Sequence, residues 1–100
     1  MAKGYWIVRV DVDDAEGYKT YTSANGTVFK EFGARILVRG GTHEAAEGEA
    51  RSRNVVIEFP DYATALAAYH SPEYQRLAEI RRRNSRGEFL IVEGYDGRQP

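Results

Sequence analysis

His70 and Tyr74 stand out for their chemistry, because residues four positions apart share one side of a helical path. A histidine titrates near neutral pH and can move a proton, while a tyrosine hydroxyl can orient a substrate oxygen. The two residues therefore predict a catalytic pair. The alternative is that His70 only binds the free carbonyl groups at a helix end, where a cation is also favoured by the helix dipole.

Arg39 is the third candidate for catalysis. It precedes Gly40 and Gly41, and glycines let the chain turn sharply or let a ligand approach the backbone. A guanidinium group can hold a carboxylate or an enolate through two parallel hydrogen bonds. The alternative is a structural ion pair with Glu58 or Glu93.

Tyrosines predict an aromatic ligand-binding cavity between helices and sheet. Tyr18 and Tyr21 lie in a predicted helix, and Tyr5 and Trp6 lie in the first predicted strand. A buried tyrosine hydroxyl requires a partner and so often points into a cavity or towards water. Plain core packing is the alternative for this set of residues.

Glu58 and Glu93 complete the predicted ligand-binding residues. Both lie near the ends of predicted strands, where they could form a carboxylate pair. The alternative is that they form salt bridges with one of three arginines, Arg9, Arg39 or Arg81.

The composition limits the class of function. The 100 residues are 42% apolar and 29% charged, which indicates one globular domain over residues 1–100 and neither disorder nor a membrane protein. A formal net charge of −1 supplies no basic field for nucleic acid. The sequence has no cysteine and no recognisable export signal, so we expect a cytoplasmic location.

No metal site is predicted. Residues 42–52 contain His43 and three glutamates, but one histidine and mobile carboxylates lack the fixed spacing of a metal site. The basic run Arg81–Arg83, with Arg86, is typical of a helix end on a solvated surface rather than of a nucleic-acid patch.

The periodicity predicts four strands and two helical regions. Alternating or apolar segments predict strands over residues 5–12, 34–39, 53–59 and 88–94. One helix is expected between Asp13 and Phe32, and a second begins after Asp61, is interrupted at Pro72 and continues as a short helix capped by Ser71. Residues 96–100 are expected to form a surface tail. The order β-α-β-β-α-β predicts an α+β, ferredoxin-like fold with a four-stranded antiparallel sheet and both helical regions on one face.

The predicted strands carry bulky residues on both faces, as with Trp6 and Val8 against Tyr5 and Ile7. A sheet with one face in water should show clean alternation of apolar and polar residues. We therefore expect a partner to cover the second face, and a homodimer built sheet to sheet is the simplest one.

Several short motifs occur in order along nearly the whole chain. They are RGG at Arg39–Gly41, EG at Glu47–Gly48, VIEFPDY at Val56–Tyr62, YHSPEYQ at Tyr69–Gln75, the single Arg81 and IVEGY at Ile91–Tyr95. Together they resemble the domain-of-unknown-function family 1330 of the dimeric α+β barrel superfamily. The resemblance implies a ferredoxin-like protomer whose sheet pairs with that of a second copy. We expect no bound cofactor. Superfamily members include small monooxygenases without a prosthetic group, lactone isomerases, haem-modifying enzymes and ligand-sensing domains, so the fold leaves the chemistry open.

These features predict a homodimer that binds a small anionic or carbonyl-bearing organic molecule. As a cofactor-independent enzyme, it would use Arg39 to stabilise an oxyanion, His70 to transfer a proton and Tyr74 to orient the substrate. As a non-catalytic sensor or carrier, it would use the same arginine and tyrosines only to hold the ligand. A third interpretation is a haem-handling protein with His70 as axial ligand.

Overall fold

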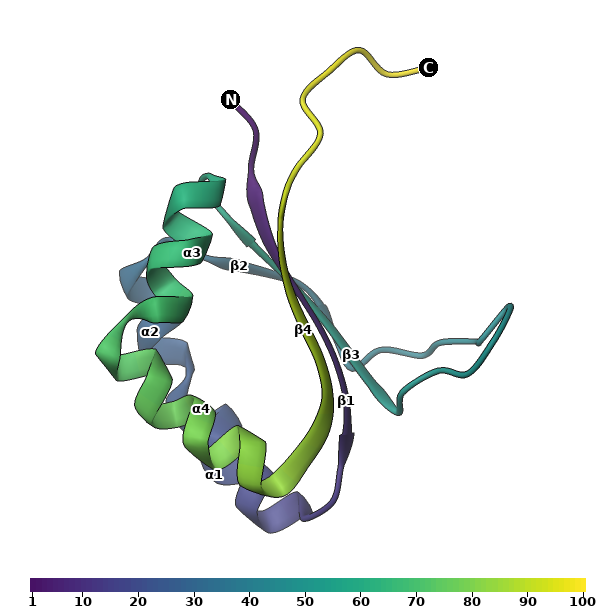
Figure 1. Cartoon of the computed structure of the whole chain (residues 1–100), viewed down its shortest axis with the longest axis vertical. Helices are drawn as coiled ribbons and strands as arrows, with labels where there is room; N and C mark the ends of the chain where they lie inside the picture. Colours follow the sequence, from purple (N-terminus) through teal and green to yellow (C-terminus); the bar gives the residue numbers. More distant parts are fainter.

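The computed structural model describes residues 1–100 as a four-stranded antiparallel sheet with helices on one face (Figure 1). In chain order the elements are β1 (Gly4–Val12), α1 (Ala15–Ala24), α2 (Gly26–Glu31), β2 (Arg35–Arg39), β3 (Arg53–Phe59), α3 (Tyr62–His70), α4 (Pro72–Asn84) and β4 (Ser85–Glu93). The strand order is β2-β3-β1-β4. This arrangement confirms the predicted α+β, ferredoxin-like fold.

The helices begin where the sequence predicts but divide differently. Asp14, Asp61 and Ser71 cap α1, α3 and α4 by accepting hydrogen bonds from backbone amides. The single helix expected up to Phe32 is wrong, because the helical path is interrupted at Asn25, directly before Gly26, a poor helix former. The helix after Ser71 is long rather than short and runs for 13 residues. No helix combines the length and apolar character needed to cross a membrane.

Trp6 lies at the centre of the core and is fully buried. Its indole N–H donates a hydrogen bond to the Ala65 carbonyl at 2.9 Å and so ties β1 to α3. Its ring contacts aromatic rings from the surrounding elements, at centroid distances of 4.7 to 5.7 Å, from Phe29, Phe59, Tyr74 and Phe89. One side chain therefore fixes the distance between the sheet and the helices that cover it.

The opposite face of the sheet carries a row of apolar side chains that no helix covers. Ile7 on β1 pairs with Val56 on β3 and with Leu90 on β4, one residue along from the buried Trp6. Leu90 is 55% exposed and Val38 on β2 is 41% exposed. We call this row the outer apolar face. It confirms that the strands are apolar on both sides.

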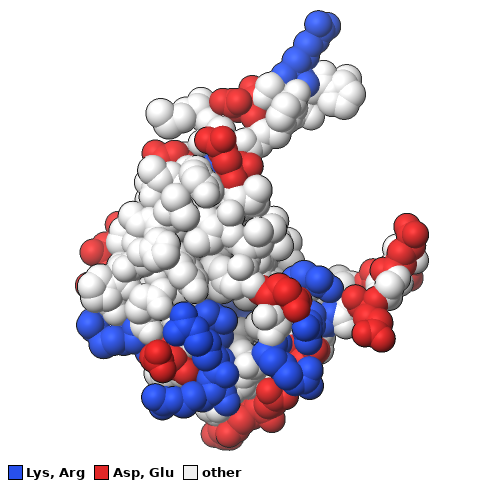
Figure 2. Space-filling model, in the orientation of Figure 1, with Lys and Arg blue, Asp and Glu red and all other residues white.

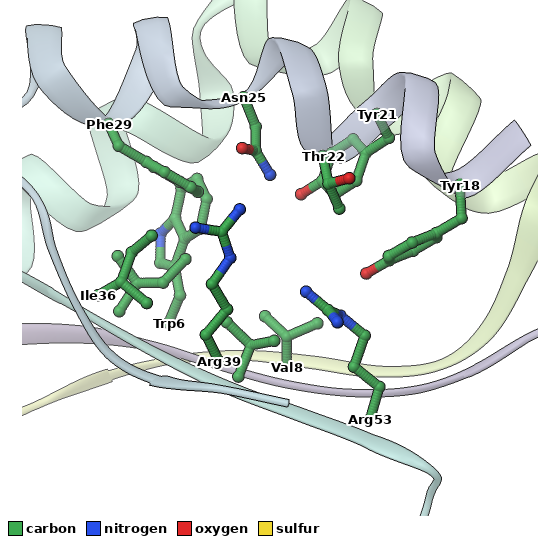
Figure 3. A pocket seen from close by; sticks show the side chains of 12 residues that line it. Trp6, Val8, Tyr18, Tyr21, Thr22, Asn25, Phe29, Ile36, Arg39 and Arg53 are labelled. Carbon is green, nitrogen blue, oxygen red and sulfur yellow. The ribbon is translucent and has the colours of Figure 1, made fainter. Parts of the chain in front are cut away.

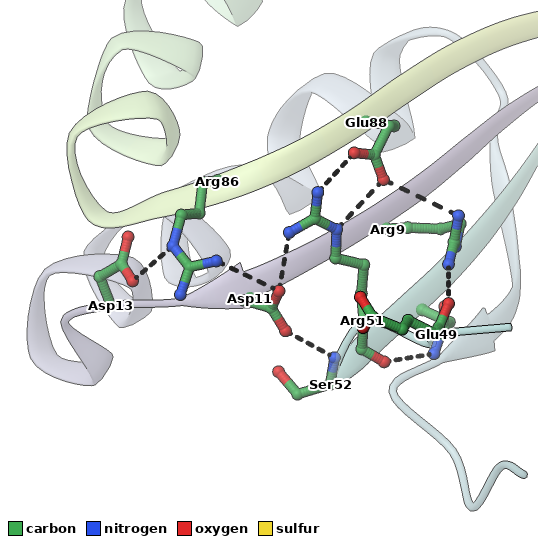
Figure 4. A network of polar contacts seen from close by, with 9 residues as sticks. Arg9, Asp11, Asp13, Glu49, Arg51, Ser52, Arg86 and Glu88 are labelled. Atoms are coloured by element: carbon green, nitrogen blue, oxygen red, sulfur yellow. Dashed lines mark hydrogen bonds and ion pairs between the residues drawn. The ribbon is translucent and has the colours of Figure 1, made fainter. Parts of the chain in front are cut away.

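The segment of residues 40–52, which we call the arm, leaves the sheet on the side away from the helices (Figure 1). Figure 2 shows acidic side chains along the projecting arm and basic side chains over α4 and near the arm's base. The arm's base is held by Arg51, which binds Asp11 at 2.8 Å and Glu88 at 2.6 Å (Figure 4). The Ser52 amide also donates to Asp11, at 2.9 Å. Residues 95–100 are exposed and have no regular structure.

The ion pairs at the arm's base predict a dependence of stability on pH. Hydrogen bonds from Arg51 and from the Ser52 amide lower the pKa of Asp11 from 3.8 to about 2. Because the folded pKa lies below the unfolded one, this stabilisation is present above the unfolded pKa and is lost as pH falls through the folded pKa. We expect the free energy of unfolding, measured by urea denaturation, to fall between about pH 5 and pH 2 and this slope to be smaller in Asp11→Asn. Asp96→Asn, in the exposed tail, is the control and should keep the wild-type slope.

Candidate functional site

A cavity lies between α1 and the half of the sheet formed by β1, β3 and β2 (Figure 3). It has a volume of about 420 Å³ including its open mouth, of which about 30 Å³ is wide enough for the centre of a water molecule. Its lining is Trp6, Val8, Tyr18, Tyr21, Thr22, Asn25, Phe29, Ile36, Arg39, Arg53, Val55 and Ile57. The free space is therefore narrow, and a larger guest requires side chains at the mouth to move.

The regular periods of strand and helix build most of the walls. Trp6 and Val8 are alternate residues of β1, and Val55 and Ile57 are alternate residues of β3, so all four face the helices. Three residues of the opposite wall, Tyr18, Tyr21 and Asn25, follow one another at steps of three and four along the helix. The walls are thus mainly apolar, with hydroxyl and amide groups on the helix side.

Arg39 reaches the cavity because of a β-bulge. Ile36 pairs with Ile57 and Val38 pairs with Val56, so Leu37 is the extra residue on β2. In a regular strand Arg39 would share the outer face with Arg35, since residues alternate between the two faces. The bulge shifts the register by one and pairs Arg39 with Val55, which lines the cavity.

Arg53 is the second cation of the cavity. Its guanidinium carbon lies 5.6 Å from the centre of the Tyr18 ring, and its Nε atom is buried with no hydrogen-bond partner. Neither Arg39 nor Arg53 forms a salt bridge, and no carboxylate lines the cavity. Two guanidinium groups therefore meet apolar and aromatic walls without a counter-charge, an arrangement suited to an anion.

The mouth of the cavity adds a third cation. An open hollow next to the cavity is lined by Tyr18, Thr22, Arg39 and Arg53 again, together with Val12, Ala15 and Lys19. No acidic residue lines this hollow either. Lys19 therefore adds a third positive charge beside the two arginines.

A pair of buried tyrosine hydroxyls lies behind the cavity wall. The hydroxyl oxygens of Tyr21 and Tyr74 are 2.6 Å apart, and Tyr74 is fully buried. Burial raises the pKa of Tyr21 and raises that of Tyr74 far above its usual value, so both phenols are neutral. Arg81 is only 8% exposed, lies 5.0 Å from the Phe89 ring centre and forms no salt bridge. The sequence-based placement of Arg81 on a solvated surface is wrong.

The predicted pairing of His70 with Tyr74 is wrong in its geometry. Ser71 between them has extended backbone angles of φ −65° and ψ 143°, so the helical path is not continued. His70 is exposed at the end of α3, whereas Tyr74 is fully buried. The carbonyls at this helix end accept hydrogen bonds from Ser71 and from Gln75, at 2.8 and 2.6 Å, rather than from His70.

The structure brings Arg39, Tyr18 and Tyr21 together in the cavity but places Tyr5, Glu58 and Glu93 elsewhere. Tyr5 donates a hydrogen bond to Glu58 at 3.0 Å on the outer face of the sheet, and this bond raises the pKa of Tyr5. Glu93 pairs with Gly4, and the alternation of β1 puts it on the other face. The two glutamates therefore cannot form the carboxylate pair considered from the sequence.

Arg53 is the main residue that the sequence-based prediction missed. The sequence pattern could have identified it, because Arg53 lies two residues before Val55 in the alternating set, with Ile57 and Phe59, that faces the core. A charged residue in register with a buried apolar set indicates a functional or paired position. Asn25 also had a signal, because it follows Tyr18 and Tyr21 at helical spacing, whereas Thr22 had none, because polar residues on a helix are usually solvent-exposed.

Comparison with known proteins identifies a family that matches most of the chain. The family described as "Domain of unknown function (DUF1330)" matches residues 3–95. No curated protein matches the sequence significantly.

Solved structures share the fold. The RPA0582 protein of unknown function from Rhodopseudomonas palustris is similar at 17% identity and a TM-score of 0.75, over 99% of this chain and 85% of that one. SnoaB, a cofactor-independent oxygenase from Streptomyces nogalater, is similar at 14% identity and a TM-score of 0.64, over 100% of this chain and 97% of that one. A dabb family protein with a ferredoxin-like fold from Mesorhizobium loti is 12% identical, with a TM-score of 0.60, over 95% and 97% of the two chains. At these identities the likeness concerns the fold alone.

The unpaired charge of Arg53 predicts a gain in stability when it is removed. Arg53→Met keeps an apolar stem of similar length but deletes a partly buried guanidinium that has no carboxylate partner. We expect the free energy of unfolding without ligand, measured by urea denaturation, to rise by about 1 kcal/mol. Arg98→Met, in the exposed tail, should leave it unchanged. A decrease in Arg53→Met would show that the contact with Tyr18 outweighs the cost of burial.

Proposed function

The chain belongs to the DUF1330 family, and we propose that it binds a small organic anion in the cavity between α1 and the sheet. The observation that carries this proposal is the convergence of Arg39 and Arg53 on an apolar cavity without any carboxylate. Arg53 is partly buried, and its Nε atom lacks a partner, which costs free energy that a bound anion would offset in part. The ligand therefore supplies the missing negative charge.

The residues that line the cavity indicate the chemical character of the rest of the ligand. Planar guanidinium groups suit a carboxylate or an enolate, because they donate two parallel hydrogen bonds. Trp6, Val8 and Ile57 offer an apolar floor for a flat or aromatic body. Since the free space is narrow, a ligand of this size requires side chains at the mouth, such as the exposed Arg39, to move.

We favour a binding role, as carrier or sensor, over proton-transfer catalysis. The residues that line the cavity include no histidine, lysine or carboxylate, the side chains that most often transfer protons in catalysis. His70, the predicted proton carrier, is not among the lining residues. The lining residues are therefore better suited to binding an anion than to transferring a proton.

A cofactor-independent enzyme is the second candidate, and its support is the fold shared with the oxygenase SnoaB. In that case Arg39 and Arg53 would stabilise negative charge that develops on a substrate oxygen. The same cavity would serve both functions, so turnover of a bound acid decides between them.

We also infer that two copies of the chain associate through the outer apolar face. Leu37, Val38, Leu90 and Val92 are all more than a third exposed there or at its edge. Contiguous exposed apolar surface on a sheet is typical of an interface, and a two-fold axis would bury the same residues of each copy. The cytoplasmic location expected from the sequence stays a prediction.

Ligand binding is tested with benzoate and its neutral isostere benzamide. We expect benzoate, but not benzamide, to raise the melting temperature and to shift the amide signals of Tyr18 and Thr22 in NMR spectra. Arg39→Gln and Arg53→Gln should each weaken benzoate binding by about tenfold or more, because each removes a charge-assisted hydrogen bond. Arg98→Gln is the matched control for a distant arginine. Equal binding of benzamide, or full benzoate affinity in the double glutamine variant, would contradict the proposal.

Association is tested by sedimentation at micromolar concentration. We expect the wild type to sediment as a dimer, at twice the chain mass of 11.3 kDa. We expect Leu90→Lys to sediment as a monomer, because dimerisation would bury the lysine charge at the centre of the interface without a partner. Ala67→Lys, on the exposed side of α3, should remain dimeric. A wild type that sediments as one chain would refute the dimer and leave the cavity proposal standing.

A further inference from the structure

We propose that the ligand of this site is an organic dianion with a phosphate-type head group, and that Lys19 binds the second negative charge. This inference rests on the proposed function, since it specifies the ligand of the same cavity. It also gives a role to the open hollow at the cavity mouth, which a single carboxylate held by the two arginines does not need.

The room for a head group lies in the hollow rather than in the cavity. About 30 Å³ of the cavity is wide enough for the centre of a water molecule, compared with about 460 Å³ of the hollow. The two spaces adjoin, because Tyr18, Thr22, Arg39 and Arg53 line both of them. A ligand therefore has room for a bulky charged group in the hollow, with its apolar part directed into the narrower cavity.

Cations reach the hollow from two walls. Arg39 and Arg53 belong to β2 and β3, whereas Lys19 belongs to α1, on the other side of the hollow. Lys19, like the two arginines, forms no salt bridge. Since no acidic residue lines the hollow, its three positive charges have no counter-charge there. A single carboxylate would neutralise only one of them.

Gly40 leaves room for the guanidinium group of Arg53. Its φ of 62° lies in the left-handed region, and a Cβ atom at this position would come within 3.0 Å of a terminal nitrogen of Arg53. On another side, the guanidinium carbon lies 5.6 Å from the centre of the Tyr18 ring. Figure 3 shows the side chains of Arg39 and Arg53 both directed towards α1. Gly40 and Tyr18 therefore place the Arg53 cation at the hollow, although no carboxylate holds it there.

A phosphate monoester fits this arrangement better than a carboxylate. Its head group carries a charge of about −1.5 to −2 near neutral pH and has three oxygens that accept hydrogen bonds. These oxygens point in different directions, so they can meet guanidinium groups on the sheet and an ammonium group on the helix together. A carboxylate has one charge and two oxygens in one plane, so it leaves Lys19 without a partner.

Phenyl phosphate and phenyl sulfate test the inference, because they are similar in size and shape and differ in charge. At pH 8 the phosphate ester is above its second pKa of about 6 and is a dianion, whereas the sulfate ester is a monoanion. We expect the wild type to bind phenyl phosphate about tenfold more tightly in NMR titrations at low ionic strength. The amide signals of Lys19 and Gly40 should shift. Shifts confined to α4, where Arg82 and Arg83 are exposed, would overturn the inference.

Lys19→Gln separates the third cation from the two arginines. We expect this variant to bind phenyl sulfate within about twofold of the wild type and to prefer phenyl phosphate only about threefold, since an exposed ion pair contributes modestly. Lys30→Gln removes the same charge from an exposed position on α2, away from the hollow, and should keep the tenfold preference. Full preference in Lys19→Gln, or an equal loss in Lys30→Gln, would overturn the role of Lys19.

The outcomes separate this inference from the proposed function. A wild type that binds the two esters equally would overturn the dianion and leave the site for a single anion intact. Binding of benzoate without binding of phenyl phosphate would have the same meaning. Failure of the wild type to bind phenyl phosphate, phenyl sulfate and benzoate would overturn the proposed function and this inference together.

Discussion

The position of Trp6 is the constraint on which the rest of the structure depends. Its ring fills the space where β1 faces the helices, and its N–H group is satisfied by the Ala65 carbonyl of α3. The same ring forms part of the cavity floor and packs against Tyr74. Core and site are therefore not separate regions of this small protein. A change in how the helices pack on Trp6 would alter the width of the cavity and the position of the buried hydroxyl pair.

Charge is distributed in the interior in a way that stability alone does not explain. Arg53 and Arg81 lie at the two ends of a row of four aromatic rings formed by Tyr18, Tyr21, Tyr74 and Phe89. Each has a buried Nε atom without a hydrogen-bond partner. Contacts with the Tyr18 and Phe89 rings offset part of the cost of burying these cations, but a cation–π contact is weaker than a paired carboxylate. On the outer side of the sheet, by contrast, Arg51 is fully paired with acids, so the chain does provide counter-charges where structure requires them.

The sequence predicted the fold well because its signals are local. Alternation defines the strands, and Asp14, Asp61 and Ser71 each cap a helix through a hydrogen bond only three residues long. The site was predicted less well because it depends on relations between distant segments. The extended backbone of Ser71 turns His70 away from Tyr74, and the strand register puts Glu58 and Glu93 on opposite faces. Neither relation is visible in residue spacing along one helix or strand. Arg53 was the exception, since its place in an apolar alternation could have been recognised.

The bulge at Leu37 shows how a single extra residue connects the two faces of the sheet. With regular pairing, Leu37 would face outward and Val38 inward, and Arg39 would join the outer face. The register shift instead puts Val38 opposite Val56 on the outer apolar face and Arg39 opposite Val55 at the cavity. One local irregularity thus adds an apolar residue to one surface and a cation to the other. The proposed anion site and the uncovered face of the sheet are thus linked through β2, although they lie on opposite sides of it.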